Sequence, residues 1–224
     1  MEKLAELYKR WKGEAPVSMT ILPEAGSKRK YYRITGNDGE SVIGVVGNSR
    51  DENHTFIYLT KHFTDRKLPV PHILAVDDDE LRYLQTDLGS TSLFDVLRGG
   101  RESGGRYNMR EKQLLTAVIR ELPNIQIRGA RGLDWDVCYP QPEFDVDSVL
   151  FDLNYFKYCF LKATELEFHE LKLEANFRLF AKDLTSEKSE SFLYRDFQAR
   201  NVMLDHAGKP YFIDYQGGRK GPYY

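Results

Sequence analysis

A short segment near the carboxyl end of the chain constrains its fold more than any other part of the sequence. It reads Tyr-Arg-Asp-Phe-Gln-Ala-Arg-Asn over residues 194–201, and the sequence Phe-Ile-Asp-Tyr-Gln follows after a turn. Apolar runs at 202–204 and 211–213 flank that glycine-containing turn, which predicts two short antiparallel strands. Such a hairpin would bring Asn201, which precedes the first strand, next to Asp214, which follows the second.

The side chains gathered by this hairpin carry oxygen atoms of the kind that Mg²⁺ prefers. Asp196 lies five residues before Asn201, and Asp214 lies thirteen residues after it. Mg²⁺ is a hard cation that takes oxygen ligands and keeps several waters, so one carboxylate, one amide oxygen and the phosphates of a substrate make a suitable shell. We therefore expect Asn201 and Asp214 to hold Mg²⁺. The plainer alternative is that these residues cap a loop and end a strand, as Asp and Asn often do.

The segment 193–216 resembles the catalytic loop and metal loop of the aminoglycoside phosphotransferase and choline kinase group, which consists of small-molecule kinases with a protein-kinase-like fold. Residues 26–33, Gly-Ser-Lys-Arg-Lys-Tyr-Tyr-Arg, resemble the phosphate-covering hairpin of that group, and residues 84–89, Leu-Gln-Thr-Asp-Leu-Gly, resemble its hinge between lobes. Together with Gln126 after an apolar helix, these segments look most like the bacterial kinases that phosphorylate the cell-wall amino sugars N-acetylmuramate and N-acetylglucosamine.

The resemblance implies an α+β protein with a two-lobed, protein-kinase-like fold. An antiparallel sheet with helices would form an amino lobe over residues 1–87, and a mainly helical carboxyl lobe would occupy residues 88–224. The implied activity is transfer of the γ-phosphoryl group of ATP to a hydroxyl of a small molecule, with Mg²⁺ as cofactor. The implied acceptor is a sugar or an amino sugar, and Asp196 would accept the proton of its hydroxyl.

The resemblance also implies a place for the nucleotide. Backbone N–H groups around Gly26 and Ser27 would cover the phosphates. The adenine would lie between the lobes, bound to the backbone over Gln85, Thr86 and Asp87.

Two departures from the kinase pattern bear on this expectation. The histidine that usually precedes Arg-Asp is Tyr194, which can still pack behind the loop and donate one hydrogen bond. The third strand, at 41–46, lacks the lysine that normally binds the phosphates. Arg29 and Arg33 are the expected substitutes, although this charged run could instead be a solvated rim of the hairpin. Without the lysine, we expect Glu52 in the next helix to lie at the surface.

The same departures leave a second function open, that of a nucleotide-binding pseudokinase acting as a scaffold or regulatory domain. Retention of all three oxygen donors argues against it. Kinase activity on proteins is disfavoured because no Ala-Pro-Glu activation segment follows Asp214. The sequence ends ten residues past Asp214, whereas the similar kinases continue, so we expect a fragment of a longer protein.

Composition and charge limit the kinds of partner that we expect this protein to bind. The chain has a net charge of -2 and a pI near 6.2, so it lacks the basic field that draws proteins to nucleic acid or to anionic membranes. No apolar run approaches the roughly 18 residues that a membrane span needs, and no signal sequence opens the chain. We therefore expect a cytoplasmic protein without nucleic-acid or membrane partners. Cys138 and Cys159 are expected to be reduced thiols.

Periodicity predicts the secondary structure of the amino half. Apolar residues at helical spacing before Gly13 indicate an amphipathic helix over residues 2–12. Strand-like runs separated by turns predict an antiparallel sheet, with strands at 17–22, 31–35, 41–46, 73–76 and 81–86.

Overall fold

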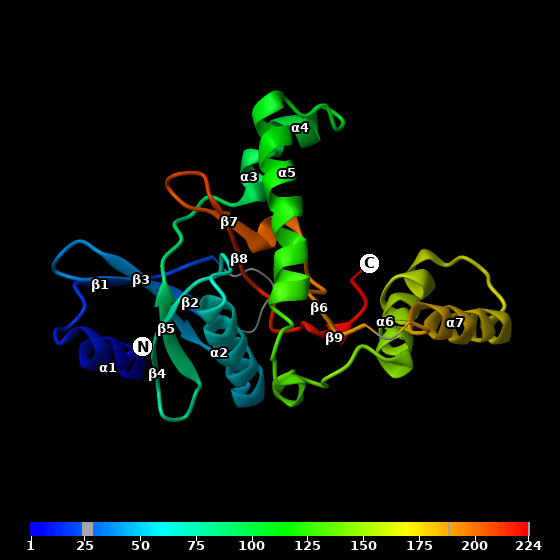
Figure 1. Cartoon of the computed structure of the whole chain (residues 1–224), viewed down its shortest axis with the longest axis horizontal. Coiled ribbons are helices and arrows are strands. Elements are labelled where there is room, and N and C mark those ends of the chain that lie inside the picture. Colours follow the sequence, from blue (N-terminus) through cyan, green and yellow to red (C-terminus); the bar gives the residue numbers. More distant parts are fainter. Residues whose placement is uncertain (24–28, 188, 224) are drawn as a thin grey trace.

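The amino-terminal part of the chain is built around an antiparallel sheet (Figure 1). The computed structural model describes residues 1–23, 29–187 and 189–223, and within them this sheet has five strands in the order β1-β2-β3-β5-β4. The strands are β1 (Ser18–Ile21), β2 (Lys30–Thr35), β3 (Ser41–Val46), β4 (Ile73–Val76) and β5 (Arg82–Thr86). The predicted sheet is confirmed, with strand ends that differ from the prediction by one residue.

Each face of this sheet is covered by a helix. α1 (Glu2–Lys12) packs Leu4, Leu7 and Tyr8 onto one face, as its apolar spacing predicted, and ends at Gly13. The φ of Gly13 is 87°, a left-handed conformation that glycine adopts without strain. α2 (Arg50–Asp65) covers the opposite face, where Phe56 stacks on the ring of Tyr83 with centroids 5.4 Å apart.

The rest of the chain is mainly helical. Figure 1 shows α5 as a long helix beside the sheet, while α6 and α7 pair to form a hairpin at the far side of the molecule. None of the helices in the described ranges is both long and apolar enough to cross a membrane. The helices are α3 (Leu93–Val96), α4 (Arg98–Glu102), α5 (Met109–Pro123), the π-helix η1 (Asn124–Arg128), the 3₁₀ helix η2 (Trp135–Val137), α6 (Val146–Cys159), the 3₁₀ helix η3 (Leu161–Thr164), α7 (Glu170–Leu184) and the 3₁₀ helix η4 (Ala199–Asn201).

Two short antiparallel strand pairs lie in the carboxyl-terminal segment. β6 (Ser191–Leu193) pairs with β9 (Arg219–Gly221), and β7 (Val202–Leu204) pairs with β8 (Pro210–Phe212). The second pair is the hairpin predicted around the turn 205–210, with its second strand shifted by one residue.

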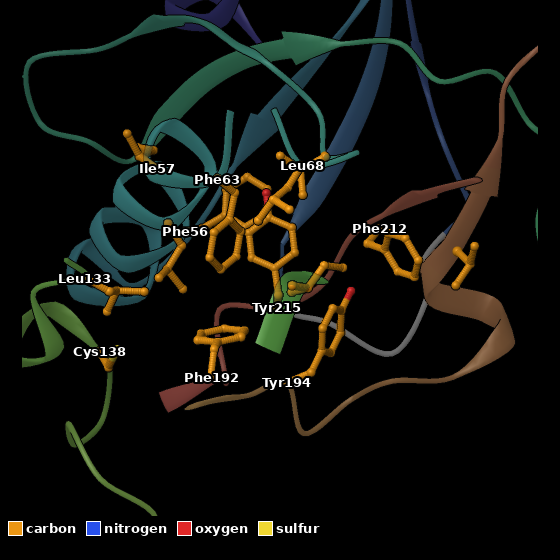
Figure 2. Packing of buried hydrophobic residues seen from close by; sticks show 14 of the residues in the cluster. Phe56, Ile57, Phe63, Leu68, Leu133, Cys138, Phe192, Tyr194, Phe212 and Tyr215 are labelled. Carbon is orange, nitrogen blue, oxygen red and sulfur yellow. The ribbon is translucent and has the colours of Figure 1, made fainter. Parts of the chain in front are cut away.

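A cluster of buried aromatic rings joins the two parts of the chain (Figure 2). The ring of Tyr215 lies 5.2 Å from that of Phe56 and 5.2 Å from that of Phe63, both of which come from α2. Its hydroxyl also forms a 2.7 Å hydrogen bond with Thr60 of the same helix. Since Tyr215 directly follows Asp214, this packing fixes the position of Asp214 relative to the sheet.

Candidate active site

A cleft of about 630 Å³ lies between the sheet and the β7–β8 hairpin. Leu22 and Ile43 line it from the sheet side, and Met203 and Ile213 line it from the hairpin side. Apolar walls of this kind, with a few polar groups between them, are typical of sites that bind a flat ring. The polar groups at the cleft include Asn201 and Asp214.

The β7–β8 hairpin brings Asn201 and Asp214 together, as its sequence predicted. Asn201 Nδ2 donates a hydrogen bond to Asp214 Oδ2 at 3.1 Å and another to the backbone carbonyl of Asp196 at 2.9 Å. Gln216 Nε2 donates to the second oxygen of Asp214, Oδ1, at 2.8 Å. Both carboxylate oxygens of Asp214 are therefore oriented by side-chain amides. We call Asp196, Asn201 and Asp214 the acidic wall; Asn201 and Asp214 line the cleft.

Asp196 is not among the residues that line the cleft but lies next to Asn201, whose amide reaches its carbonyl. Surrounding protein raises the pKa of the Asp196 carboxyl above its usual value, and the negative charge of Asp214 raises it further. A side chain at Gly217 would crowd this group, because a Cβ there would lie 3.3 Å from Asp196 Oδ2. The absence of a side chain at Gly217 leaves room beside the carboxylate.

The backbone around the acidic wall is held in an unusual conformation. Arg195 and Asp214 both have φ of 65°, in the left-handed region that non-glycine residues rarely adopt. Tyr194 is buried and its hydroxyl donates to the carbonyl of Ile213 at 2.5 Å, so it supports the residue just before Asp214. The expectation that Tyr194 packs behind the loop and donates one hydrogen bond is confirmed.

The donor set of the acidic wall fits a hard divalent cation. A carboxylate and an amide from opposite ends of one hairpin face each other, and the amide hydrogens of Asn201 are used by neighbouring oxygens, which leaves its Oδ1 for a ligand. Gln216 Oε1 is buried at the same place and has no hydrogen-bond partner in the described part of the chain. Oxygen donors of this kind are those that Mg²⁺ takes.

On the opposite side of the cleft, Arg29 is buried against α2. Only 3% of its side chain is exposed, its Nη2 lies 3.0 Å from Glu52 Oε1, and its guanidinium stacks over the ring of Phe56 at 5.6 Å. Glu52 itself lies at the surface, as expected, with 36% of its side chain exposed, but it also pairs with this arginine, which was not predicted. Arg29 is not part of a solvated rim, although the neighbouring Lys30 is exposed.

Arg33 lies in a different place from Arg29. The two-residue period of β2 sends Tyr31 and Arg33 to the face opposite Tyr32. Arg33, however, pairs with Asp87 through Nε at 2.6 Å and lines a separate cavity of about 600 Å³ beyond residues 87–89. The structure therefore separates Arg33 from the cleft that holds Asp214. We call Arg29 and Arg33 the basic wall, although neither is among the described residues that line the cleft.

The residues expected to bind the nucleotide are only partly brought together. Gln85, Thr86 and Asp87 all line the cleft. The Thr86 hydroxyl accepts from the His72 N–H at 3.0 Å, and Asp87 is bound by Arg33, so those two side chains are engaged within the protein. Gly26 and Ser27 lie outside the described residues.

Two arginines of the segment 194–201 brace it against neighbouring elements. Arg195 Nη2 lies 2.6 Å from Asp152 Oδ2 of α6, and the Arg200 guanidinium stacks on Phe94 at 4.5 Å. Sequence reasoning missed Glu52 as a partner of Arg29, and it missed Gln216 as the second amide on Asp214. The position of Gln216, two residues after Asp214, was a signal that could have found it.

Comparisons with known proteins agree with this geometry. A family model described as "Phosphotransferase enzyme family" matches residues 18–224. An N-acetylmuramate/N-acetylglucosamine kinase from Pseudomonas aeruginosa is 24% identical over 224 residues, which cover 98% of this chain and 61% of that kinase. The chain thus spans about three fifths of the length of this curated relative.

Solved structures show the same fold at low sequence identity. Choline kinase LicA from Streptococcus pneumoniae superposes with a TM-score of 0.64 at 13% identity, over 100% of this chain and 71% of LicA. The GDP and kanamycin complex of APH(2")-IIia gives a TM-score of 0.61 at 12% identity, over 100% of this chain and 75% of that protein. The fold is protein-kinase-like, and the chain belongs to the phosphotransferase enzyme family.

Proposed function

We propose that this chain carries the catalytic centre of a kinase that transfers the γ-phosphoryl group of ATP to a hydroxyl of a sugar or amino sugar. The observation that carries the proposal is the hydrogen-bonded acidic wall beside a cleft with apolar sides. The family match supports the reaction class. The relative from Pseudomonas aeruginosa, a kinase of N-acetylmuramate and N-acetylglucosamine, supports the acceptor.

In this proposal, residues 1–87 and 88–224 form two lobes with the nucleotide between them. The purine occupies the apolar part of the cleft, bound to the backbone at 85–87, and N–H groups of Gly26 and Ser27 cover the phosphates. One structure of similar fold contains AMP and another contains GDP. Similarity to these proteins therefore does not determine which purine nucleotide binds to this chain.

The residues of the acidic wall have separate tasks in the transfer. Asp196 accepts the proton of the acceptor hydroxyl while the acceptor oxygen bonds to the γ-phosphorus and the bond to the leaving ADP oxygen breaks. Its raised pKa brings this base closer to the working pH. Asn201 and Asp214 hold Mg²⁺, and a bound Mg²⁺ neutralises charge on the β- and γ-phosphates.

Arg29 supplies the cation that the third strand lacks. In protein kinases a strand lysine pairs with a glutamate of the helix that follows, and both are needed for activity. Arg29 pairs in the same way with Glu52 of α2, although it comes from the residue directly before β2. This pair favours an active enzyme over the alternative of a scaffold that binds nucleotide without using it.

The proposal is tested by Mg²⁺-dependent ADP release with a panel of sugars, amino sugars and choline, using the full-length protein, followed by analysis of the phosphorylated position. We expect Asp196→Asn to lower turnover by about 10²- to 10⁴-fold with little change in ATP affinity. Asp65→Asn, at an exposed aspartate near the end of α2, is the matched control. Nucleotide binding without transfer to any acceptor would favour the scaffold.

A further inference from the structure

Tyr31 is a polar residue of the sheet that faces the proposed nucleotide cleft. It belongs to β2, where its backbone lies opposite Val45 of β3 and its carbonyl accepts a hydrogen bond from the Leu22 N–H at 2.8 Å. It is partly buried and lines the cleft, together with Asn201 and Asp214. The neighbouring segments on both sides therefore hold Tyr31 in place, on the face of β2 that is turned to the cleft.

Charged side chains lie around the Tyr31 hydroxyl. Burial raises the pKa of this hydroxyl above its usual value, the positive charge of Arg29 partly offsets that rise, and the negative charges of Asp214 and Glu52 add to it. The hydroxyl therefore keeps its proton at neutral pH. Because it lies near both the Arg29–Glu52 pair and the proposed ligand of Mg²⁺, it is at the end of the cleft where the phosphates are proposed to bind.

The proton of the Tyr31 hydroxyl is available to a ligand. Arg29 can only donate hydrogen bonds, so it cannot accept this proton. The described residues place no acceptor within hydrogen-bond distance of the hydroxyl, and its oxygen is not among their buried polar atoms without a partner. A hydroxyl with an unused proton at the wall of a cleft can donate to a molecule that binds there.

We infer that the Tyr31 hydroxyl donates a hydrogen bond to the phosphates of the nucleotide, where protein kinases use a lysine of the third strand. The inference rests on the proposed function, in which Mg²⁺ and the phosphates lie beside Asp214. Arg29 is buried behind the cleft and is not among the described residues that line it. Tyr31 is therefore the group through which this part of the sheet reaches the phosphates.

A neutral donor suits this place better than a second cation. Val45 of the third strand lies directly across from Tyr31 and is fully buried, and Arg29 already brings one positive charge to the same region. Two cations close together in a buried place repel each other and lose their hydration. A phenol adds no charge, and hydrogen bonds to charged phosphate oxygens are roughly twice as strong as those between neutral groups. Arg29 thus supplies the charge and Tyr31 the direct contact.

The test compares the dissociation constants of ATP, with Mg²⁺ present, and of adenosine, which has no phosphates, measured by calorimetry on the full-length protein. Tyr31→Phe keeps the ring at the wall of the cleft and removes only the hydroxyl. We expect it to weaken ATP binding by about tenfold and to leave adenosine binding nearly unchanged. The ratio of the two constants is taken within each variant, so partial unfolding of a variant cancels.

Tyr32→Phe is the matched control, because it removes the same group from the opposite face of β2, where Tyr32 packs against α1. This variant should leave both constants unchanged. Unchanged ATP affinity in Tyr31→Phe, or an equal loss of adenosine affinity, would overturn the inference and leave the proposed function standing. Failure of the unmodified protein to bind ATP would overturn both proposals.

A second measurement tests whether Arg29 acts on the phosphates through Tyr31. In the Arg29→Gln background, the hydroxyl lacks its neighbouring charge, so Tyr31→Phe should weaken ATP binding by only about twofold. An undiminished tenfold effect in that background would show that the two residues act independently, and it would overturn the division of tasks between them.

Discussion

The acidic wall and the basic wall are held in place by different kinds of contact. On the acidic wall, Asn201 and Asp214 are thirteen residues apart and meet across one hairpin. On the basic wall, each arginine is held by a carboxylate far along the chain. Glu52 is 23 positions from Arg29, and Asp87 is 54 positions from Arg33. The comparison teaches that the local chain brings the oxygen donors together, whereas long-range pairing decides where each arginine lies.

Arg29 and Arg33 show that spacing along the chain was not enough to predict where each side chain lies. Both lie on or next to β2 and both were candidates for the phosphate-binding cation. Arg29 is buried with its partner behind the cleft, while Arg33 pairs with Asp87 toward another cavity. If the two walls work as proposed, substitutions in each should affect different steps.

The largest effect is expected at Asp214. Asp214→Asn keeps the shape of the side chain but removes the negative charge that would hold Mg²⁺. Because a catalytic metal contributes several kcal/mol, we expect transfer to fall by about 10²- to 10⁴-fold. The readouts are turnover and the Mg²⁺ concentration for half-maximal activity. A variant that retains turnover within about tenfold of the unmodified protein would remove Asp214 from the metal site.

Substitutions in the basic wall should have a smaller effect, and the effect should differ between Arg29 and Arg33. Arg29→Gln should raise the dissociation constant of ATP by about 10- to 100-fold, since a hydrogen bond to a charged group is worth about 1.5–3 kcal/mol. Arg33→Gln should leave that constant nearly unchanged. It should instead lower the free energy of unfolding by about 1–3 kcal/mol, because it removes a partner of the buried Asp87 carboxylate. Equal losses of ATP affinity in both variants would contradict the distinction.

A substitution at Gln216 tests how strongly Mg²⁺ binding depends on the orientation of the Asp214 carboxylate. Gln216→Leu removes the amide that donates to Asp214 Oδ1 without removing a charge. Partners of this kind typically change metal affinity by about 10- to 100-fold, and we expect the lower end of that range. The measurement is Mg²⁺ affinity in the presence of ATP. Gln113→Leu, at an exposed residue of α5, is the control that should leave it unchanged.

The smallest expected effect concerns stability and pH. The folded protein raises the pKa of Asp196, so it binds the proton more tightly than the unfolded chain, and ionising Asp196 destabilises the fold. Asp196→Asn should therefore raise Tm at neutral pH while lowering activity. The gain should shrink as pH falls through the raised pKa and vanish below the unfolded value of about 3.9. Equal Tm values for both proteins across this range would contradict the expectation.

Much of the fold and part of the site could be predicted from the sequence. The strands of the sheet and the helix before Gly13 follow from local periodicity, and the meeting of Asn201 with Asp214 follows from a short hairpin. The pairing of Glu52 with Arg29 was not predicted, because Arg29 lies outside the strand on which the kinase pattern places a cation.

The sequence by itself determined the acidic wall, because two strands joined by a short turn leave few ways to arrange the residues that flank them. Only the tertiary structure decided which arginine lies behind the cleft, what Gln85 faces and how Tyr215 docks Asp214 onto α2. Those features depend on contacts between elements that are far apart in the chain. Burial and charge pairing select among the arrangements that the sequence allows, and no local pattern encodes them.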